Sequence, residues 1–485
     1  MPFIPINIYK VDLLKLNMVN VLVLGQYPRA TALTRAAWQS KNVYKSGLVE
    51  EIFIAPGNAA TAHFGVNINL DINDFDAVVE FCKSKDIKFI LTDSEDQIAA
   101  GIVDVARKVG IYCVGPVKEL AWVEADKGKA RDAMKEAGIP IPEYIVSNNV
   151  ENARKGIRYM LKKYGACYAK YSHLYGGKGA PRVETEEQME KYLIEFSDHS
   201  EKKGLPFSIS IEEPLTGYEL SSYYICGVSR DGEPIWRFVG DAEDYKYSGH
   251  RIKEGSSFFK GQDGPVTGGM GSNSPSALIL NANLTKQIEE DIIAPFLKHI
   301  ANKGTPYTGV LYFGGIADHK DGDWTVKVIE FNMRFGDPEE ATIQLRRESD
   351  IVPFLLASAG HPDFWLEDQP EMKISKEVTV NFVFATHNYP SNYKPYIDKI
   401  IHGLEKIEGR DDIFAYLGPT YLDGEDIKTK GSRVMELVAR GKNYHEARQK
   451  VLELVGLKEN MIGFDQMQFN IDIGTRAIDV EWLFR

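Results

Sequence analysis

The segment 326–339 reads VKVIEFNMRFGDPE and spaces three polar side chains two residues apart. Because successive side chains of a strand point to opposite faces, Glu330, Asn332 and Arg334 are expected to share one face. The intervening apolar side chains are expected to face the core: Ile329, Phe331 and Met333. A carboxylate and an amide oxygen at this spacing suit Mg²⁺, and the guanidinium could neutralise charge on a transferring phosphoryl group. Taken alone, a half-exposed strand with solvated polar residues is the commoner explanation.

A glycine-rich turn in KYSHLYGGKG (170–179) supplies a second candidate element. Its glycines permit a tight loop whose backbone N–H groups can face phosphate oxygens, and Lys178 adds a positive charge there. Lys170 on the preceding strand and Lys127 at the start of a helix are further cations. The spacing differs from GxxxxGK[ST], which excludes an ordinary P-loop, and a flexible hairpin is the simpler explanation of this loop by itself.

Two further segments carry candidate binding groups. In IEEPLTGYEL (211–220) a strand runs into a proline, and such a hinge can offer backbone groups to the edge of an adenine. Glu219, after the turn, can accept hydrogen bonds from ribose hydroxyls. Surface glutamates are common, so this element alone indicates little. DYKYSGHRIKEG (244–255) is as consistent with a basic ligand-binding loop as with a solvated insertion.

The secondary structure expected to position these groups changes along the chain, from alternating strands and helices to strands and hairpins. Apolar runs at 19–25, 51–57, 88–93 and 111–116 alternate with helix-patterned stretches, which predicts βαβ units, a parallel sheet and ligands at the carboxyl ends of its strands. A helix is expected at 127–138, and Gly138 ends it. Strands and hairpins follow. The stretch 240–275 has little periodicity and is expected to form ordered functional loops.

Composition excludes several classes of function. The chain has 485 residues with 57 basic and 69 acidic side chains, a net charge of −12 that disfavours binding to nucleic acid or to anionic membranes. Its four cysteines form no CxxC pair, so neither a zinc knuckle nor a disulfide framework is indicated, and a reducing cytoplasm fits best. No apolar run approaches the roughly 18 residues of a membrane helix. Small-molecule substrates are therefore expected, for a monomer or a homodimer.

Taken in order, the motifs resemble the ATP-grasp superfamily, and more narrowly phosphoribosylamine–glycine ligases. GPVTGGMGSNSP (264–275) and FNMRFGDPE (331–339) are the most specific strings, and the likeness extends from Val19 to about Ile478. The resemblance implies an α/β and α+β multidomain chain, with an ATP-grasp fold and an N-terminal Rossmann-like parallel-sheet domain. It implies that ATP phosphorylates glycine to glycyl phosphate, which 5-phosphoribosylamine then attacks to give glycinamide ribonucleotide, a step of purine biosynthesis.

The resemblance also assigns roles to residues. It implies ATP and Mg²⁺ or Mn²⁺ as cofactors, with Glu330 and Asn332 as metal ligands. The implied ATP-binding residues are Lys127, Lys170, Lys178, Glu212, Glu213, Leu215 and Glu219. The implied catalytic residues are Arg334, Lys178 and Asp337. The implied substrate-binding residues are Arg29, Gly57, Asn58, Glu95, Thr267, Gly268, Gly269 and Met270.

Five parts are expected along the chain. Residues 1–17 would be an N-terminal extension and 18–120 the βαβ domain. The central ATP-grasp domain would combine 121–141 with 216–375, and the lid would be 142–215. A small α+β domain is expected over 376–485.

Two loops near the expected substrate depart from the family pattern. A glycine pair followed by Arg-Glu-His-Ala is usual, whereas this chain has Tyr27 and Pro28 before Arg29. A second loop keeps Glu95 but adds acidic residues at Asp93 and Asp96, and negative charge is unexpected beside a phosphosugar. Two alternatives therefore stay open: an ATP-grasp ligase that joins a different carboxylate and amine, and a nucleotide-binding homologue without catalysis.

Overall fold

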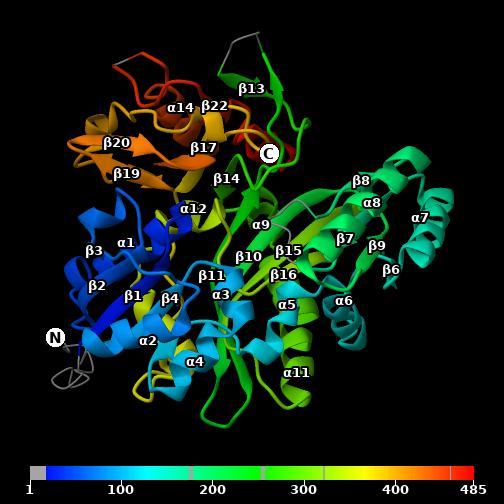
Figure 1. Ribbon diagram of the computed structural model, residues 1–485, viewed down its shortest axis with the longest axis horizontal. Helices are drawn as coiled ribbons and strands as arrows, with labels where there is room; N and C mark the ends of the chain where they lie inside the picture. Colours follow the sequence, from blue (N-terminus) through cyan, green and yellow to red (C-terminus); the bar gives the residue numbers. More distant parts are fainter. Residues whose placement is uncertain (1–17, 174–178, 253–256, 321–322, 459, 485) are drawn as a thin grey trace, which may run out of the picture.

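The computed structural model describes residues 18–173, 179–252, 257–320, 323–458 and 460–484. The N-terminal unit lies at the lower left of Figure 1, the large sheet in the middle, the lid at the far right and the C-terminal unit at the top. Within these described ranges, none of the helices combines the length and the apolar character needed to cross a membrane.

The N-terminal unit is a parallel sheet, as the sequence predicts. Its strands are β1 (Val19–Gly25), β2 (Val49–Pro56), β3 (Val66–Asn67), β4 (Ile87–Thr92) and β5 (Tyr112–Cys113), in the order β3-β2-β1-β4-β5. Its helices are α1 (Pro28–Asn42), α2 (Phe75–Ser84), α3 (Glu95–Ala100) and α4 (Ile102–Lys108). The chain builds outward from β1 in both directions, so the strand order reverses between β1 and β4. Open α/β sheets bind ligands in the crevice at such a point.

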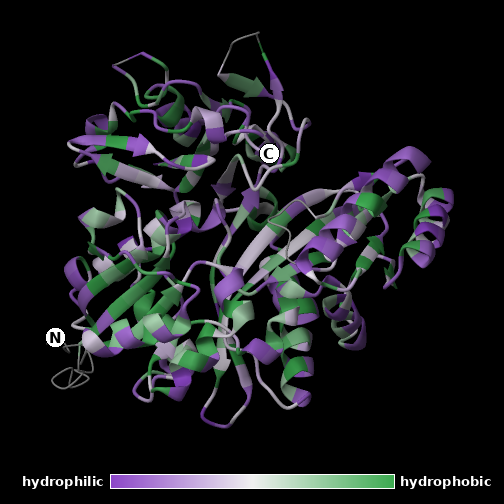
Figure 2. Ribbon diagram, viewed as in Figure 1, coloured by the Kyte–Doolittle hydropathy of each residue, from purple (hydrophilic) through white to green (hydrophobic). Residues whose placement is uncertain are grey.

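The segment expected to be the lid folds as a four-stranded antiparallel sheet covered by two helices. Its strands are β6 (Tyr144–Ser147), β7 (Cys167–Tyr171), β8 (Arg182–Val183) and β9 (Ile209–Glu212), in the order β6-β9-β7-β8. The helices are α7 (Val150–Tyr164) and α8 (Glu186–Lys203), and their outer turns are largely hydrophilic in Figure 2. Apolar side chains between sheet and helices, such as Ile157 and Phe196, form the core of the lid.

One large sheet joins the centre of the protein to its C-terminal unit. The central strands are β10 (Tyr218–Val228), β11 (Pro234–Asp244), β15 (Gly309–Lys320) and β16 (Asp323–Asn332). The C-terminal strands are β17 (Val378–Thr386), β18 (Ile413–Leu417), β21 (Arg433–Gly441) and β22 (Met467–Asn470), beside the hairpin of β19 (Thr420–Asp423) and β20 (Asp426–Thr429). Strand β14 (Gly271–Ser274) pairs with both β11 and β17 and thereby connects the two groups.

The segment 240–275 is more regular than the sequence suggests. Besides the end of β11, it contains β12 (His250–Arg251), β13 (Phe258–Lys260) and β14, so the expectation of loops alone is wrong. These strands are short: β12 pairs with β13, whereas β13 and β14 pair with β22 and β17, far away in sequence. Their residues lack local periodicity because the distant partners, not an alternating pattern, hold them extended.

Two groups of helices accompany the large sheet, one from the central part of the chain and one from further along it. Before and within the central part they are α5 (Trp122–Ala125), α6 (Lys127–Glu136), α9 (Ala277–Ala282), α10 (Thr285–Ile288) and α11 (Ala294–Asn302). Further along they are α12 (Glu339–Gln344), α13 (Val352–Ser358), α14 (Tyr444–Leu452) and α15 (Thr475–Leu483). The stacked rings of Phe296 on α11 and Phe331 on β16, 4.2 Å between centroids, show how tightly α11 packs on the sheet.

Strand β16 contains an irregularity that changes the expected face pattern. Glu330 pairs with Gly314, but Val328 pairs with Gly315, so Ile329 is the extra residue of a bulge. Phe331 and Met333 lie in the core as expected, whereas Ile329 is only half-buried and the core residue before the bulge is Val328. The expectation that Ile329 shares their face is therefore wrong, because the bulge shifts the alternation by one residue.

A buried ionic triad connects the lid to the large sheet. The Glu212 carboxylate, 3% exposed, accepts from Arg131 at 2.7 and 2.9 Å and pairs with Lys170 at 2.8 Å. Arg131 also donates to the carbonyl oxygens of Val328, at 2.9 Å, and Ile329. Burial opposes the charge of Glu212, but Arg131 and Lys170 outweigh it and lower its pKa to about 2.

We expect Glu212→Gln to lower the free energy of unfolding by about 3–5 kcal/mol, because two buried cations lose their counter-charge. Urea unfolding followed by circular dichroism measures the change. The control is Glu186→Gln in the exposed pair with Arg158 on the lid surface, which should behave like the wild type. Equal loss of stability in both variants would contradict the structural role of the triad.

The same contribution should depend on pH. A carboxylate with a lowered pKa stabilises the fold above its unfolded value of about 4.5, and the benefit is lost as the pH falls towards 2. The difference in stability between the wild type and Glu212→Gln should therefore be constant above pH 4.5 and shrink below it. A difference that grows on acidification would refute this assignment.

Candidate active site

The end of β16 presents a carboxylate, Glu330, that forms no ion pair with any cation of the described residues. Among the described residues, no basic group lies within ion-pair distance of Glu330, although Lys246, Lys170 and Lys127 lie near enough to act on it electrostatically. Burial raises the pKa of Glu330, but these three lysines and Arg334 outweigh it and lower the pKa below the usual value. The carboxylate is therefore anionic at neutral pH and its oxygens are available to a ligand.

Glu330 and Asn332 together provide suitable oxygen ligands for a divalent cation. In the described part of the chain, the Asn332 side chain has no hydrogen-bonding partner either, and no three His, Cys, Asp or Glu side chains gather into a closed metal site. Mg²⁺ commonly takes one or two protein oxygens and completes its shell with water and phosphate oxygens. The donor set thus fits Mg²⁺ or Mn²⁺ bound together with a nucleotide.

Lys246 is a cation near Glu330 that sequence reasoning missed. It follows β11, inside the segment 244–255 whose role the sequence leaves open, and it forms an ion pair with Glu219 on β10. Burial lowers the pKa of Lys246, but Glu219 outweighs it, so the pKa lies well above the usual value. Glu219, expected at a ribose, is thus half-buried beside a permanent positive charge. The DYK string alone could not indicate this, because only the pairing of β10 with β11 brings the two side chains together.

The other residues expected at ATP divide into two groups. Lys170 and Glu212 lie in the buried triad, so their charged groups already have protein partners. Glu213 pairs with Lys327 at 2.6 Å, and Leu215 is half-buried on the connection from β9 to β10. The backbone N–H of Lys127 donates to the carbonyl oxygen of Ser172 at 3.1 Å, which places the start of α6 against the lid. Lys178 lies outside the described residues.

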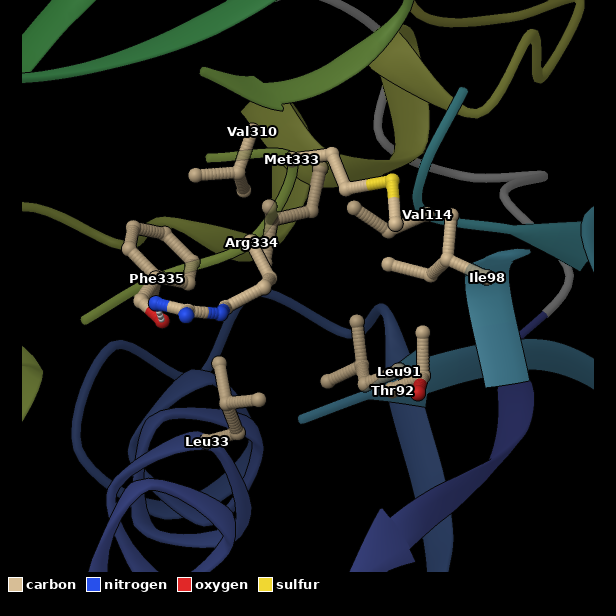
Figure 3. A pocket seen from close by; sticks show the side chains of 10 residues that line it. Leu33, Leu91, Thr92, Ile98, Val114, Val310, Met333, Arg334 and Phe335 are labelled. Carbon is tan, nitrogen blue, oxygen red and sulfur yellow. Dashed lines mark hydrogen bonds between the residues drawn. The ribbon is translucent and has the colours of Figure 1, made fainter. Parts of the chain in front are cut away.

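Arg334 is clamped between two carboxylates immediately after β16. It donates to Glu124 of α5 at 2.7 Å and to Glu95 of α3 at 3.1 Å. It also donates to the carbonyl oxygen of Phe335, the one of these contacts drawn in Figure 3. The backbone N–H of Met333 donates to the same Glu124 carboxylate at 2.9 Å. Burial opposes the charge of Glu95, but Arg334 and Arg29 outweigh it and lower its pKa to about 2. The cavity beside Arg334 measures about 10 Å³, too small for a substrate.

The C-terminal unit holds the TGGMG turn against the GDPE turn. Arg433 of β21 donates to the carbonyl oxygens of Gly268, at 2.7 Å, and Asp337, at 2.8 Å, and pairs with the Asp337 carboxylate at 2.8 Å. The N–H of Gly268 donates to the Tyr389 hydroxyl at 2.8 Å. Gly269 has φ +114°, and a Cβ there would lie 2.5 Å from Pro338. Only glycine allows this approach of the two turns.

The remaining residues of the TGGMG turn have internal partners. The Thr267 hydroxyl donates to the carbonyl oxygen of Lys246 at 2.8 Å, and the Met270 N–H donates to that of Tyr245 at the same distance. Met270 is fully buried in the core. Thr267 thus fixes the backbone at Lys246, and Met270 anchors the turn rather than lining a surface.

In the N-terminal unit, Asn58 joins three segments. Its side-chain amide donates to the carbonyl oxygens of Gln26, at 3.0 Å, and Leu417, at 2.9 Å, and to the Thr31 hydroxyl at 2.9 Å. Gly57 before it has φ +70°. Arg29 donates to the carbonyl oxygen of Phe335 at 2.7 Å and lies 3.8 Å from Glu95. The structure therefore brings Arg29 and Glu95 to the Arg334 cluster, whereas Asn58 and Gly57 shape the neighbouring turn.

Three family models match consecutive parts of this chain. They describe the N domain (residues 19–124), the ATP-grasp (A) domain (125–340) and the C domain (379–476) of phosphoribosylglycinamide synthetase. The resemblance to ATP-grasp proteins is thereby confirmed.

Curated relatives match over almost their whole length. The phosphoribosylamine–glycine ligase of Vibrio parahaemolyticus is 34% identical over 462 residues, covering 95% of this chain and 99% of the relative. That of Escherichia coli K12 is 32% identical over 465 residues, covering 96% and 100%.

Solved structures agree in fold. The phosphoribosylamine–glycine ligase of Thermotoga maritima superposes with a TM-score of 0.72 at 25% identity, covering 94% of this chain and 100% of that one. A biotin carboxylase from Campylobacter jejuni reaches 0.67 at 15% identity, covering 97% and 95%, and shares the fold alone. The chain belongs to the phosphoribosylamine–glycine ligase family.

Proposed function

We propose that this protein joins glycine to 5-phosphoribosylamine at the expense of ATP, giving glycinamide ribonucleotide, ADP and phosphate. Its curated relatives are named for that activity, and they match this chain over nearly their full length. The observation that carries the proposal is the Glu330 carboxylate on the same strand as Asn332, which three lysines keep charged while no cation of the described residues pairs with it. A carboxylate kept charged and available in this way suits a phosphoryl-transfer site.

The proposed chemistry has two steps. A glycine carboxylate oxygen attacks the γ-phosphorus of ATP, the bond to the β-phosphate oxygen breaks, and glycyl phosphate and ADP result. The amine of 5-phosphoribosylamine then attacks the carbonyl carbon, phosphate leaves, and the amine gives up a proton. Because a carboxylate is a poor electrophile, the first step is needed to supply a leaving group. The protein contributes chiefly positioning and charge neutralisation.

The side chains have distinct proposed parts. Lys127, Lys246 and Lys178 would neutralise the phosphates of ATP, with Lys170 contributing charge from the triad. When bound at Glu330 and Asn332, Mg²⁺ or Mn²⁺ would supply further neutralisation of phosphate oxygens. Each guanidinium nitrogen of Arg334 donates a hydrogen bond within the protein, to Glu95, Glu124 or the carbonyl oxygen of Phe335, so we assign it a positioning role just after β16. Asp337, paired with Arg433, would position the GDPE turn.

The wider organisation follows the same proposal. The division into an extension (1–17), a βαβ domain, an ATP-grasp domain, a lid and a C-terminal domain stays a prediction, as does a monomeric or homodimeric state. The four cysteines are buried and free, which suits a reducing compartment such as the cytoplasm. A ligase that uses another amine is the second candidate, favoured by the buried carboxyl group of Asp93 directly after β4.

The direct test is ADP release by the purified protein with Mg-ATP, glycine and freshly generated 5-phosphoribosylamine, each omitted in turn. We expect release to require all three. Release that needs ATP and an amine but not 5-phosphoribosylamine would replace this proposal by the second candidate.

Glu330→Gln should reduce ADP release at least about a hundredfold, because several kcal/mol of charge stabilisation depend on the cation that this carboxylate would hold. Circular dichroism should be unchanged. Glu290→Gln, on an exposed helical surface, is the control and should retain full activity. An active Glu330→Gln enzyme with unaltered dependence on Mg²⁺ would exclude Glu330 as a ligand.

Arg433→Met should lower kcat about ten- to a hundredfold while the KM for ATP changes little. Without Arg433 the Gly268 and Asp337 carbonyls lose their common donor, and a small displacement of the two turns is costly for the reaction. Steady-state kinetics measure the split between kcat and KM. The control is Arg440→Met in the same strand, where the arginine pairs with Glu377 away from both turns. Equal kcat values in both variants would contradict the role of Arg433 in positioning the two turns.

A further inference from the structure

Strand β21 brings an acidic side chain, Glu436, to the GDPE turn. Glu436 is fully buried, and its Oε2 accepts from the Asn381 amide of β17 at 2.8 Å. The same amide donates to the carbonyl oxygen of Pro338 at 3.0 Å, so β17, β21 and the turn meet at one point. Among the described residues, no donor reaches Oε1 of Glu436. One oxygen of a buried carboxyl group is thus left without a hydrogen bond from a donor.

A carboxyl group of the turn lies in contact with Glu436. The side chains of Glu436 and Asp337 are hydrogen-bonded to each other. Two ionised carboxylates offer only acceptors, so a hydrogen bond between them requires that one of them holds a proton. Arg433 forms an ion pair with Asp337 at 2.8 Å and thereby favours the ionised form of Asp337. The proton therefore belongs to Glu436.

The surroundings of Glu436 favour its neutral form. Burial raises the pKa of Glu436 well above the usual value, and the negative charge of Asp337 adds to this effect. Arg433 and the hydrogen bond from Asn381 act in the opposite direction without reversing it. The other titratable group beside Glu436 is Tyr416 of β18, which is neutral at pH 7 because burial raises its pKa to about 12. Glu436 is accordingly a hydrogen-bond donor at neutral pH.

We infer that Glu436 is a positioning residue: its protonated carboxyl group donates a hydrogen bond to the Asp337 carboxylate and so fixes the GDPE turn against the TGGMG turn. Arg433 and Glu436 hold Asp337 from the same strand, one as a cation and the other as a neutral donor. The inference rests on the proposed function only in taking these two turns as parts of the ligase site. Unlike the role of Arg433, it depends on a proton that a rise in pH removes.

The first test compares two substitutions in the full-length protein. Glu436→Gln keeps a neutral donor and acceptor of the same shape, whereas Glu436→Met removes both. Glu436→Met should lower kcat for ADP release about tenfold at an almost unchanged KM for ATP, because a small displacement of the turn is costly. Glu436→Gln should restore kcat to near the wild-type value. It should also abolish the loss of activity that ionisation of Glu436 causes in the wild type at alkaline pH.

Hydrogen exchange reports the position of the turns without turnover. The backbone amides of 267–270 and 336–339 should exchange faster in Glu436→Met than in the wild type, because the turns are no longer held together. In Glu436→Gln their exchange should match that of the wild type.

The second test is the pH dependence of unfolding. In the unfolded chain Glu436 ionises above about pH 4.5, whereas the folded protein keeps it neutral, so the wild type loses stability as the pH rises through this range. Glu436→Gln has no such proton to lose. Relative to the wild type, its folding constant should therefore rise by up to about tenfold per pH unit from about pH 5 to 8, as measured by urea unfolding. The matched control is Glu340→Gln, another buried glutamate, which accepts from Arg347 at 2.8 Å and should be less stable than the wild type throughout.

A Glu436→Gln variant that is no more stable than the wild type at about pH 8 would overturn the protonated state of Glu436. Equal kcat and equal hydrogen exchange in the wild type and Glu436→Met would overturn the positioning role, as would a Glu436→Gln variant as slow as Glu436→Met. If Glu436→Met does not fold, an alkaline loss of activity in Glu436→Gln equal to that of the wild type would refute the inference in its place. A wild type that releases no ADP would end the proposed function, while unfolding and hydrogen exchange would still decide the inference.

Discussion

The ion pairs of Arg334 are the constraint on which the site depends. This side chain lies two residues after the strand that carries Glu330 and Asn332, and it is held by Glu124 from the start of the central part and by Glu95 from the N-terminal unit. Breaking a buried, hydrogen-bonded pair leaves an uncompensated charge, which is strongly unfavourable. The end of β16 and the N-terminal unit are therefore held in a fixed relation to each other.

The lid and the C-terminal unit are attached by different means. The lid meets the large sheet through the Arg131, Glu212 and Lys170 triad, which contacts the carbonyl oxygens at the β16 bulge. The C-terminal unit is attached by backbone pairing of β14 with β17 and by Arg433. A bulge frees carbonyl oxygens from the strand ladder, so the irregularity in β16 is what allows the triad to reach the strand.

Local patterns in the sequence predict many of the elements and give candidates for the site. The apolar runs identify β1, β2 and β4, and the spacing of Glu330 and Asn332 predicts a pair of oxygen ligands. The bulge at Ile329 is invisible to that reasoning, because it depends on the register with Gly314 and Gly315. Lys246 and Arg433 were missed for a related reason: strand pairing and contacts between distant segments bring them to the site. Asn58 shows the opposite: it was expected at the substrate, but its side-chain amide forms hydrogen bonds within the protein.

The position of β14 limits how this chain can be divided. This strand is inserted between β11 and β17, so residues 271–274 belong by sequence to one unit and by hydrogen bonding to two. A fragment that stopped before residue 378 would expose the unpaired edge of β14, and such edges invite association with other chains. The C-terminal segment is accordingly a structural half of the catalytic sheet, and gene fusions or circular permutations would have to keep it attached.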